Sequence, residues 1–224
     1  MAYHEHNAEK MRPELIRRLK QGETVALVSD AGTPMISDPG YKLVGACLDE
    51  GIAVVPIPGA SSVLAALVAS GLPTDRFFFA GFLPPKSAAR KTALSGLIEI
   101  PGSLVIMESN RRLAGSLADM ADVLGPRPAV VARELTKLFE ESRRGSLPEL
   151  ADHYRREGPP KGEITIVIGP PSERVVDDKD LDRLLNLALK HGSVRDAAES
   201  VTAATGLSRR KVYARALALK QGPE

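Results

Sequence analysis

Leu27-Val28-Ser29-Asp30-Ala31-Gly32-Thr33-Pro34-Met35-Ile36-Ser37-Asp38-Pro39-Gly40 is the stretch in which the pattern of the chain changes most sharply. An apolar run, Thr24–Val28, stops abruptly, and small polar residues with glycine and proline follow before a helical pattern begins. This pattern is typical of a buried parallel strand that ends in a loop. Ligands of open α/β sheets bind outside the carboxyl ends of such strands. The loop is therefore a candidate ligand site, with a tight strand-to-helix turn as the alternative.

A second loop of the same kind follows. The residues Ile52–Ile57 predict another strand, which ends in Pro58-Gly59-Ala60-Ser61-Ser62, and Val63–Ala69 predicts a nearly all-apolar helix. The first N–H groups of a helix have no intrahelical partner and attract carboxylate or phosphate groups. Two such loops on adjacent parallel strands would face the same edge of a sheet, although each on its own is also a plausible turn with a helix cap.

The rest of the chain alternates strand and helix patterns, which favours a second α/β unit. A strand at Phe77–Phe82 precedes a proline-rich boundary near residue 83, and a polar linker begins after Pro171. We expect domains at 1–82, 83–171 and 178–222. The predicted strands of the second domain are 103–107, 129–132, 140–144 and 164–168, with helices at 109–124 and 147–156.

Three short helices are predicted after the linker, and the last of them is basic. Its pattern places Val212, Ala216 and Leu219 inward and leaves cations available outward, namely Arg209, Arg210, Lys211 and Arg215. Two short helices joined by a glycine turn, the second basic, resemble a helix-turn-helix. This favours contact with nucleic acid, with a small docking module as the alternative.

Charged residues follow two of the predicted strands of the second domain. Glu108 could pair with Arg111, and Arg133, Glu134 and Lys137 could form a second network. Charges at strand ends are also common as solvated rim residues, so the sequence leaves both interpretations open.

Composition limits the class of protein. The 224 residues are 43% hydrophobic and 26% charged, with a net charge of +2, as in an ordinary globular protein. The single cysteine, Cys47, excludes a disulfide within the chain. His4 and His6 have no evident third ligand, so no metal site is expected. No apolar run approaches the ~20 residues of a membrane span, and the first residues lack the apolar core of a signal peptide. We expect a cytoplasmic protein.

The two loops and several later motifs resemble those of a known family. Residues 28–40 with 56–62 resemble the tetrapyrrole methylase superfamily. Further strings resemble its ribosomal RNA small subunit methyltransferase I branch: Gly71–Phe77, Gly81–Lys86, Glu108-Ser109 with Arg111, Ala132-Arg-Glu-Leu-Thr-Lys137 with Glu140-Glu141, and Lys161–Glu163. The resemblance covers nearly the whole chain.

The resemblance implies a two-domain α/β methylase fold with a C-terminal helical module, and S-adenosylmethionine as cofactor. It further implies methyl transfer to a cytidine 2′-hydroxyl of small-subunit ribosomal RNA, and a homodimer. The implied cofactor-binding residues are Asp30, Gly32, Thr33, Pro34, Ile36, Ser61, Ser62, Met107 and Ala132. Candidates for a catalytic base or cation are Glu108, Glu134 and Lys137, and candidates for substrate contact are Lys86, Arg111, Arg133, Arg209, Arg210 and Lys211.

One feature departs from the family pattern. Members of the family begin with a strand and a Pro-x-Gly-Asn-Leu turn, whereas Met1–Asn7 matches only the region past them. The resemblance therefore predicts a truncated N-terminal domain and weak cofactor binding by this chain alone. Two alternative functions remain open: a methylase of a small tetrapyrrole, and a non-catalytic nucleic-acid-binding protein.

Overall fold

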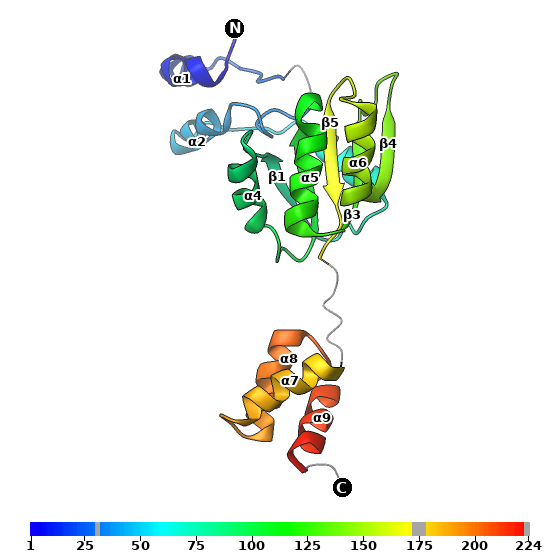
Figure 1. The fold of residues 1–224 in the computed structure, drawn as a ribbon. Helices are drawn as coiled ribbons and strands as arrows, with labels where there is room; N and C mark the ends of the chain where they lie inside the picture. The colour runs from blue at the N-terminus through cyan, green and yellow to red at the C-terminus, as the bar shows by residue number, and fades with distance from the viewer. Residues whose placement is uncertain (30–31, 172–177, 222–224) are drawn as a thin grey trace. The chain divides into compact units, whose positions relative to one another are not determined.

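The computed structural model describes residues 1–29, 32–171 and 178–221. The chain divides into two compact units, Met1–Pro171 and Ser172–Glu224. The first unit is an α/β unit and the second is helical (Figure 1). The further boundary expected near residue 83 stays a prediction, although strands from both sides of it pair in one sheet.

A five-stranded mixed sheet forms the centre of the first unit. Its strands lie in the order β1-β2-β5-β3-β4, and only β1 and β2 are parallel neighbours. Their bounds are Phe77–Phe82 (β1), Ser103–Glu108 (β2), Pro128–Arg133 (β3), Glu141–Ser146 (β4) and Ile164–Ile168 (β5). Because β2 and β3 are both antiparallel to β5, the strands β1, β2 and β3 all run the same way. Their carboxyl ends share one edge, the carboxyl edge, where β4 and β5 begin.

Three helices cover one face of this sheet (Figure 1). They are α4 (Ser87–Ser95), α5 (Leu113–Leu124) and α6 (Leu147–Glu157), and a 3₁₀ turn, η1 (Asn110–Arg112), precedes α5. Alternate strand residues such as Leu104, Ile106 and Ile166 point to this face and are fully buried. The apolar face predicted for residues 113–124 of α5 is confirmed, since each of its large side chains packs in this core.

Among the described residues, one helix, α3 (Ser62–Ser70), packs on the opposite face. Val63, Ala66 and Leu67 contact the intervening strand residues Val105 and Val167. Strand residues therefore alternate between the two faces with the period of two that a sheet imposes.

The direction of α3 follows from what its two ends touch. Arg144 of β4 donates hydrogen bonds to the carbonyl oxygens of Ala69 (2.5 Å) and Ser70 (3.3 Å), at the carboxyl end of the helix. The next residues lie beside the far end of β5, because a Cβ at Gly169 would be 3.5 Å from Leu72. A nine-residue helix spans about 13 Å, so α3 begins near the carboxyl edge and runs from it toward the far end of β5.

The two strands predicted nearest the N-terminus are wrong. Neither 24–28 nor 52–57 forms a strand, and Val28 and Ile57 are each 82% exposed. A strand needs a hydrogen-bonding neighbour, and the described residues provide none for these two segments. They flank α2 (Tyr41–Asp49), which packs on α1 (Glu5–Lys20) through Leu15, Leu43 and Cys47.

The second unit contains α7 (Asp178–Leu189), α8 (Val194–Thr205) and α9 (Arg209–Gln221), as the sequence predicts. Ser193 begins α8 with a capping box, and Val212 and Ala216 of α9 are fully buried. Among the described residues, no helix is long and apolar enough to cross a membrane.

Candidate functional site

The two glycine- and proline-containing loops meet, although the strands predicted before them do not form. The Thr33 hydroxyl donates a hydrogen bond of 2.9 Å to the carbonyl oxygen of Ala60. Gly32 adopts a φ of +71°, which favours glycine, and the Ile36 N–H donates to the Thr33 carbonyl oxygen. Pro34 lies in the same turn, whereas Asp30 lies outside the described residues.

The second loop leads directly into α3. The Ser61 hydroxyl accepts a hydrogen bond from the Leu64 N–H (3.4 Å), and Ser62 is the first residue of the helix. The α3 N-terminus thus presents its remaining N–H groups near the carboxyl edge, next to the turn that contains Thr33. This is a suitable place for a polar or anionic part of a ligand.

A row of three residues crosses the sheet near the same edge. Met107 of β2 and Ala132 of β3 are both register partners of Thr165 in β5, which lies between them. Met107 and Ala132 belong to the cluster on the α3 face. The structure therefore places the two cofactor positions implied for the second domain in one row, on the side of the sheet that α3 covers.

The side chain of Glu108 lies on the opposite face of the sheet from Met107 and Ala132. It follows Met107 on the strand, so its carboxylate lies on the face covered by α5, with none of the side chain exposed. The carboxylate accepts from the Ser109 N–H (2.6 Å) and the Ser116 hydroxyl (2.5 Å). It also pairs with Arg112 at 2.6 Å, so the predicted pair with Arg111 is wrong. In this arrangement Glu108 fixes the start of α5, and Arg111 remains exposed.

The predicted network after β3 forms only in part. Lys137 pairs with Glu134 (3.0 Å), as expected, and also with Glu163 (3.1 Å). Arg133 instead pairs with Glu141 at 3.0 Å, because the two residues lie directly opposite each other in the register of β3 and β4.

The ionised forms of Glu134 and Lys137 are both stabilised in this network. The Glu163 N–H, and then Lys137, hold the pKa of the Glu134 carboxyl below its usual value. Hydrogen bonds to Glu134, and then to Glu163, raise the pKa of Lys137. The geometry therefore maintains an anion and a cation side by side at the carboxyl edge.

The loop between β3 and β4 holds an unusual backbone. Glu134 and Thr136 have φ values of +50° and +65°, which side chains other than glycine adopt at a cost. The Thr136 N–H donates to the Glu140 carboxylate at 2.6 Å, which helps to fix the turn. The turn presents Leu138 and Phe139 to solvent, and Phe139 is 67% exposed. Sequence inspection misses this pair because it sits among charged residues.

Other predicted contact residues are accessible. Lys86 is exposed at the N-cap position of α4. Beside it, the side chain of Arg90 donates to the carbonyl oxygens of Pro84 (3.4 Å) and Pro85 (3.1 Å), which fixes the turn that carries Lys86.

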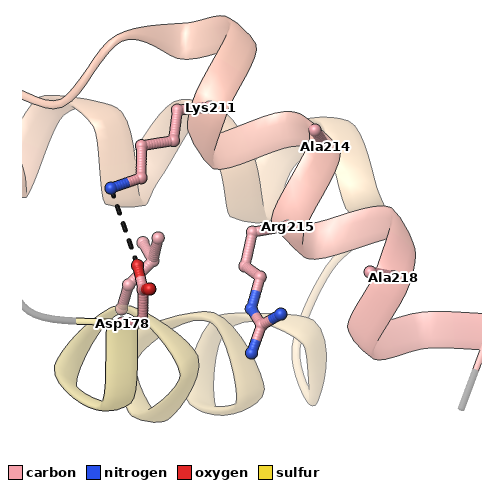
Figure 2. Close-up of a pocket in the computed structure, with 6 residues that line it drawn as sticks. Asp178, Lys211, Ala214, Arg215 and Ala218 are labelled. Carbon is pink, nitrogen blue, oxygen red and sulfur yellow. Dashed lines mark ion pairs between the residues drawn. The ribbon is translucent and has the colours of Figure 1, made fainter. Parts of the chain in front are cut away.

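In the helical unit, part of the basic surface is already paired. Arg215 forms two hydrogen bonds of 2.6 Å to Asp182 of α7, so its predicted availability is wrong. Figure 2 shows the hollow between α7 and α9, where Lys211 points toward Asp178 at 3.6 Å. Arg209 and Arg210, in the first turn of α9, are exposed and are the cations best placed for a phosphate ligand.

Comparison with known families matches both units. A family model described as tetrapyrrole (corrin/porphyrin) methylases matches residues 2–151, and one described as the RsmI C-terminal HTH domain matches residues 175–220. The family match also supports S-adenosylmethionine as the cofactor, as the resemblance implies.

Curated relatives align over most of the chain. The ribosomal RNA small subunit methyltransferase I of Mesorhizobium japonicum is 51% identical, with 98% of this chain and 75% of that protein covered. The protein of the same name from Micromonospora olivasterospora is 44% identical, with coverages of 95% and 69%. That from Halalkalibacterium halodurans is 49% identical, with coverages of 78% and 60%.

Solved structures agree at the level of the fold. Diphthine synthase superposes with a TM-score of 0.55 at 16% identity, covering 75% of this chain and 68% of that chain. The methyltransferase CobJ gives a TM-score of 0.51 at 18% identity, with coverages of 74% and 72%. Taken with the family models and curated relatives, this shows that the chain belongs to the tetrapyrrole methylase family, in the ribosomal RNA small subunit methyltransferase I branch.

Proposed function

We propose that the chain transfers a methyl group from S-adenosylmethionine to the 2′-hydroxyl of a cytidine in small-subunit ribosomal RNA. The observation that supports this best is the convergence at the carboxyl edge. The α3 N-terminus and the Met107–Ala132 row lie on one side of the sheet there, and the charges of Glu134 and Lys137 follow β3 at the same edge.

The α3 N-terminus and the Met107–Ala132 row suit the binding of S-adenosylmethionine. When bound, S-adenosylmethionine supplies an electrophilic methyl group for an in-line displacement, in which correct positioning provides much of the rate. The partly buried Met107 offers it an apolar contact, with Ala132 buried in the same row, and Ser61, Ser62 and the Thr33 turn offer polar atoms.

Glu134 and Lys137 are the candidates for assisting the ribose hydroxyl. A hydroxyl is a weak nucleophile and must lose its proton as the new bond forms. The lowered pKa of Glu134 keeps its carboxylate ionised, so that it can take the hydroxyl proton as the methyl group transfers and pass that proton to solvent. Lys137 stays protonated and offsets negative charge that develops on the oxygen.

RNA contact is proposed for six cations and for Phe139. Of these cations, Arg133 is half-buried and paired with Glu141, and Lys211 lies 3.6 Å from Asp178. Arg111, Lys86 and Arg133 suit phosphate oxygens, and Arg209, Arg210 and Lys211 suit backbone contacts by the helical unit. Phe139 presents an exposed ring, and unpaired bases stack on such rings.

A homodimer is part of the proposal. It is supported by the apolar side chains that α3 leaves exposed, Leu64 and Val68, and by those of Val55 and Ile57 in the segment before it.

Glu108 provides a test of which carboxylate takes part in the reaction. The substitution Glu108→Gln should lower the free energy of unfolding by about 1.5–3 kcal/mol, since hydrogen bonds to a buried charged group are lost. It should leave kcat within about twofold, because this carboxylate does not reach the substrate. Thermal unfolding and single-turnover methyl transfer measure the two effects. A fall in kcat of about 100-fold in a variant that remains folded would show that Glu108 is a catalytic group after all.

The function itself is tested by competition between acceptors. The chain is incubated with methyl-labelled S-adenosylmethionine, unmethylated small ribosomal subunits and a tetrapyrrole. We expect label in the RNA only, because a basic helical unit suits the binding of a polyanion such as RNA. Label in the macrocycle would support the tetrapyrrole alternative, and RNA binding without transfer would support the non-catalytic one.

A further inference from the structure

Thr165 occupies the middle of the row that the cofactor proposal uses. It lies on β5, in register with Met107 on one side and with Ala132 on the other. Directly paired residues of neighbouring strands point to the same face, so its side chain lies on the α3 face. Only 5% of the residue is exposed.

The hydroxyl of Thr165 differs from those of the buried serines of the unit. Ser70 donates to the Leu67 carbonyl (2.7 Å), Ser103 to the Pro73 carbonyl (2.6 Å) and Ser116 to Glu108. For Thr165, no hydrogen bond from the hydroxyl to any described residue is formed. The Thr165 oxygen is not one of the fully enclosed side-chain atoms that lack a partner, so it retains access to solvent. A ligand that covers it must replace that solvent with a hydrogen bond, because burying a hydroxyl without a partner is unfavourable.

This hydroxyl is a polar group within an apolar row. The neighbours in the row, Met107 and Ala132, provide only weak or no hydrogen-bonding groups, so Thr165 is the polar atom on an otherwise apolar surface. A ligand resting on this surface would give the hydroxyl its missing partner.

We propose that the Thr165 hydroxyl forms a hydrogen bond with a polar group of the nucleoside methyl donor and so positions the donor over the Met107–Ala132 row. This inference rests on the proposed function. Thr165 is a binding and positioning residue, and it takes no proton in the reaction.

The test compares Thr165→Val with Thr165→Ser in the full chain. Without cofactor, T165V should unfold at nearly the same temperature as the parent, because valine keeps the shape and no hydrogen bond within the chain is lost. Its Kd for S-adenosylmethionine, measured by calorimetric titration, should rise roughly fivefold through the lost hydrogen bond. T165S keeps the hydroxyl and should bind nearly as the parent does.

Thr202 of α8 supplies the matched control. Its hydroxyl also lacks a partner among the described residues, but it belongs to the helical unit. Thr202→Val removes a threonine hydroxyl in the same way and should leave the Kd for the donor unchanged.

The outcomes separate the inference from the proposed function. If the parent binds the donor and T165V binds it equally well, the inference fails and the proposed function stands. If T165V unfolds at a lower temperature than the parent without cofactor, the hydroxyl is structural and the inference fails again. If the parent does not bind the donor at all, the proposed function fails, and the inference fails with it.

Discussion

Replacing Asp119 by alanine should lower the free energy of unfolding of the first unit by about 3–5 kcal/mol. Asp119 on α5 pairs with Arg90 of α4 at 2.6 Å, and both side chains are less than a tenth exposed. The carboxylate also accepts a hydrogen bond from Ser87 (2.9 Å). The substitution would leave the Arg90 guanidinium buried without its counter-charge, which is more costly than removing both charges together. Urea unfolding followed by circular dichroism measures the loss.

Asp122, one turn further along α5, is the matched control. It pairs with Lys91 at 2.7 Å, but its side chain is 62% exposed. Asp122→Ala should therefore cost less than about 1 kcal/mol, as exposed ion pairs usually do. Equal losses for the two aspartates would contradict the buried packing of α4 on α5.

Replacing Arg209 and Arg210 together by glutamine should weaken binding of small-subunit RNA roughly 30-fold at about 0.1 M salt. Each cation that contacts a phosphate releases counterions, so the slope of log K against log salt should also fall by about 0.7–0.9 per contact. Both residues lie in the first turn of α9, away from the acidic pairing that engages Arg215. Filter binding across a series of salt concentrations measures the affinity and the slope.

Arg155 and Arg156 of α6 provide a control with the same change in charge. They lie in the other unit, at the end of a helix that packs on the sheet. The double substitution R155Q/R156Q should leave the salt slope unchanged. A slope that falls equally in both variants would mean that net charge, and not the α9 surface, determines RNA binding.

Local patterns in the sequence predict much of this fold. The helical periodicity of 113–124 and the β-branched run 164–168 lead to elements at almost the observed bounds. The same reasoning fails at 24–28 and 52–57. An apolar run makes a segment suitable for a strand, but a strand also needs a neighbouring strand with which to form hydrogen bonds. Pairing is a tertiary property, and here it is absent for both segments within the described residues.

For the candidate site, the sequence predicts the types of residue better than their arrangement in space. Met107 and Glu108 are adjacent on one strand, so they must point to opposite faces. That alternation is enough to separate the cofactor surface from Glu108, whereas the place of Thr165 beside Met107 depends on the pairing of β2 with β5. The choice of Arg112 over Arg111 as the partner of Glu108 depends on how η1 leads into α5, which spacing alone does not determine.

The position of the transferred methyl group tests the central claim most directly. RNA labelled by this chain is hydrolysed in alkali, where cleavage after a nucleotide requires its free 2′-hydroxyl to attack the adjacent 3′-phosphate. Methylation of the ribose oxygen predicts that the label is recovered in an alkali-resistant dinucleotide that begins with cytidine. Label recovered in a mononucleotide, or no label in the RNA, would contradict the proposed reaction.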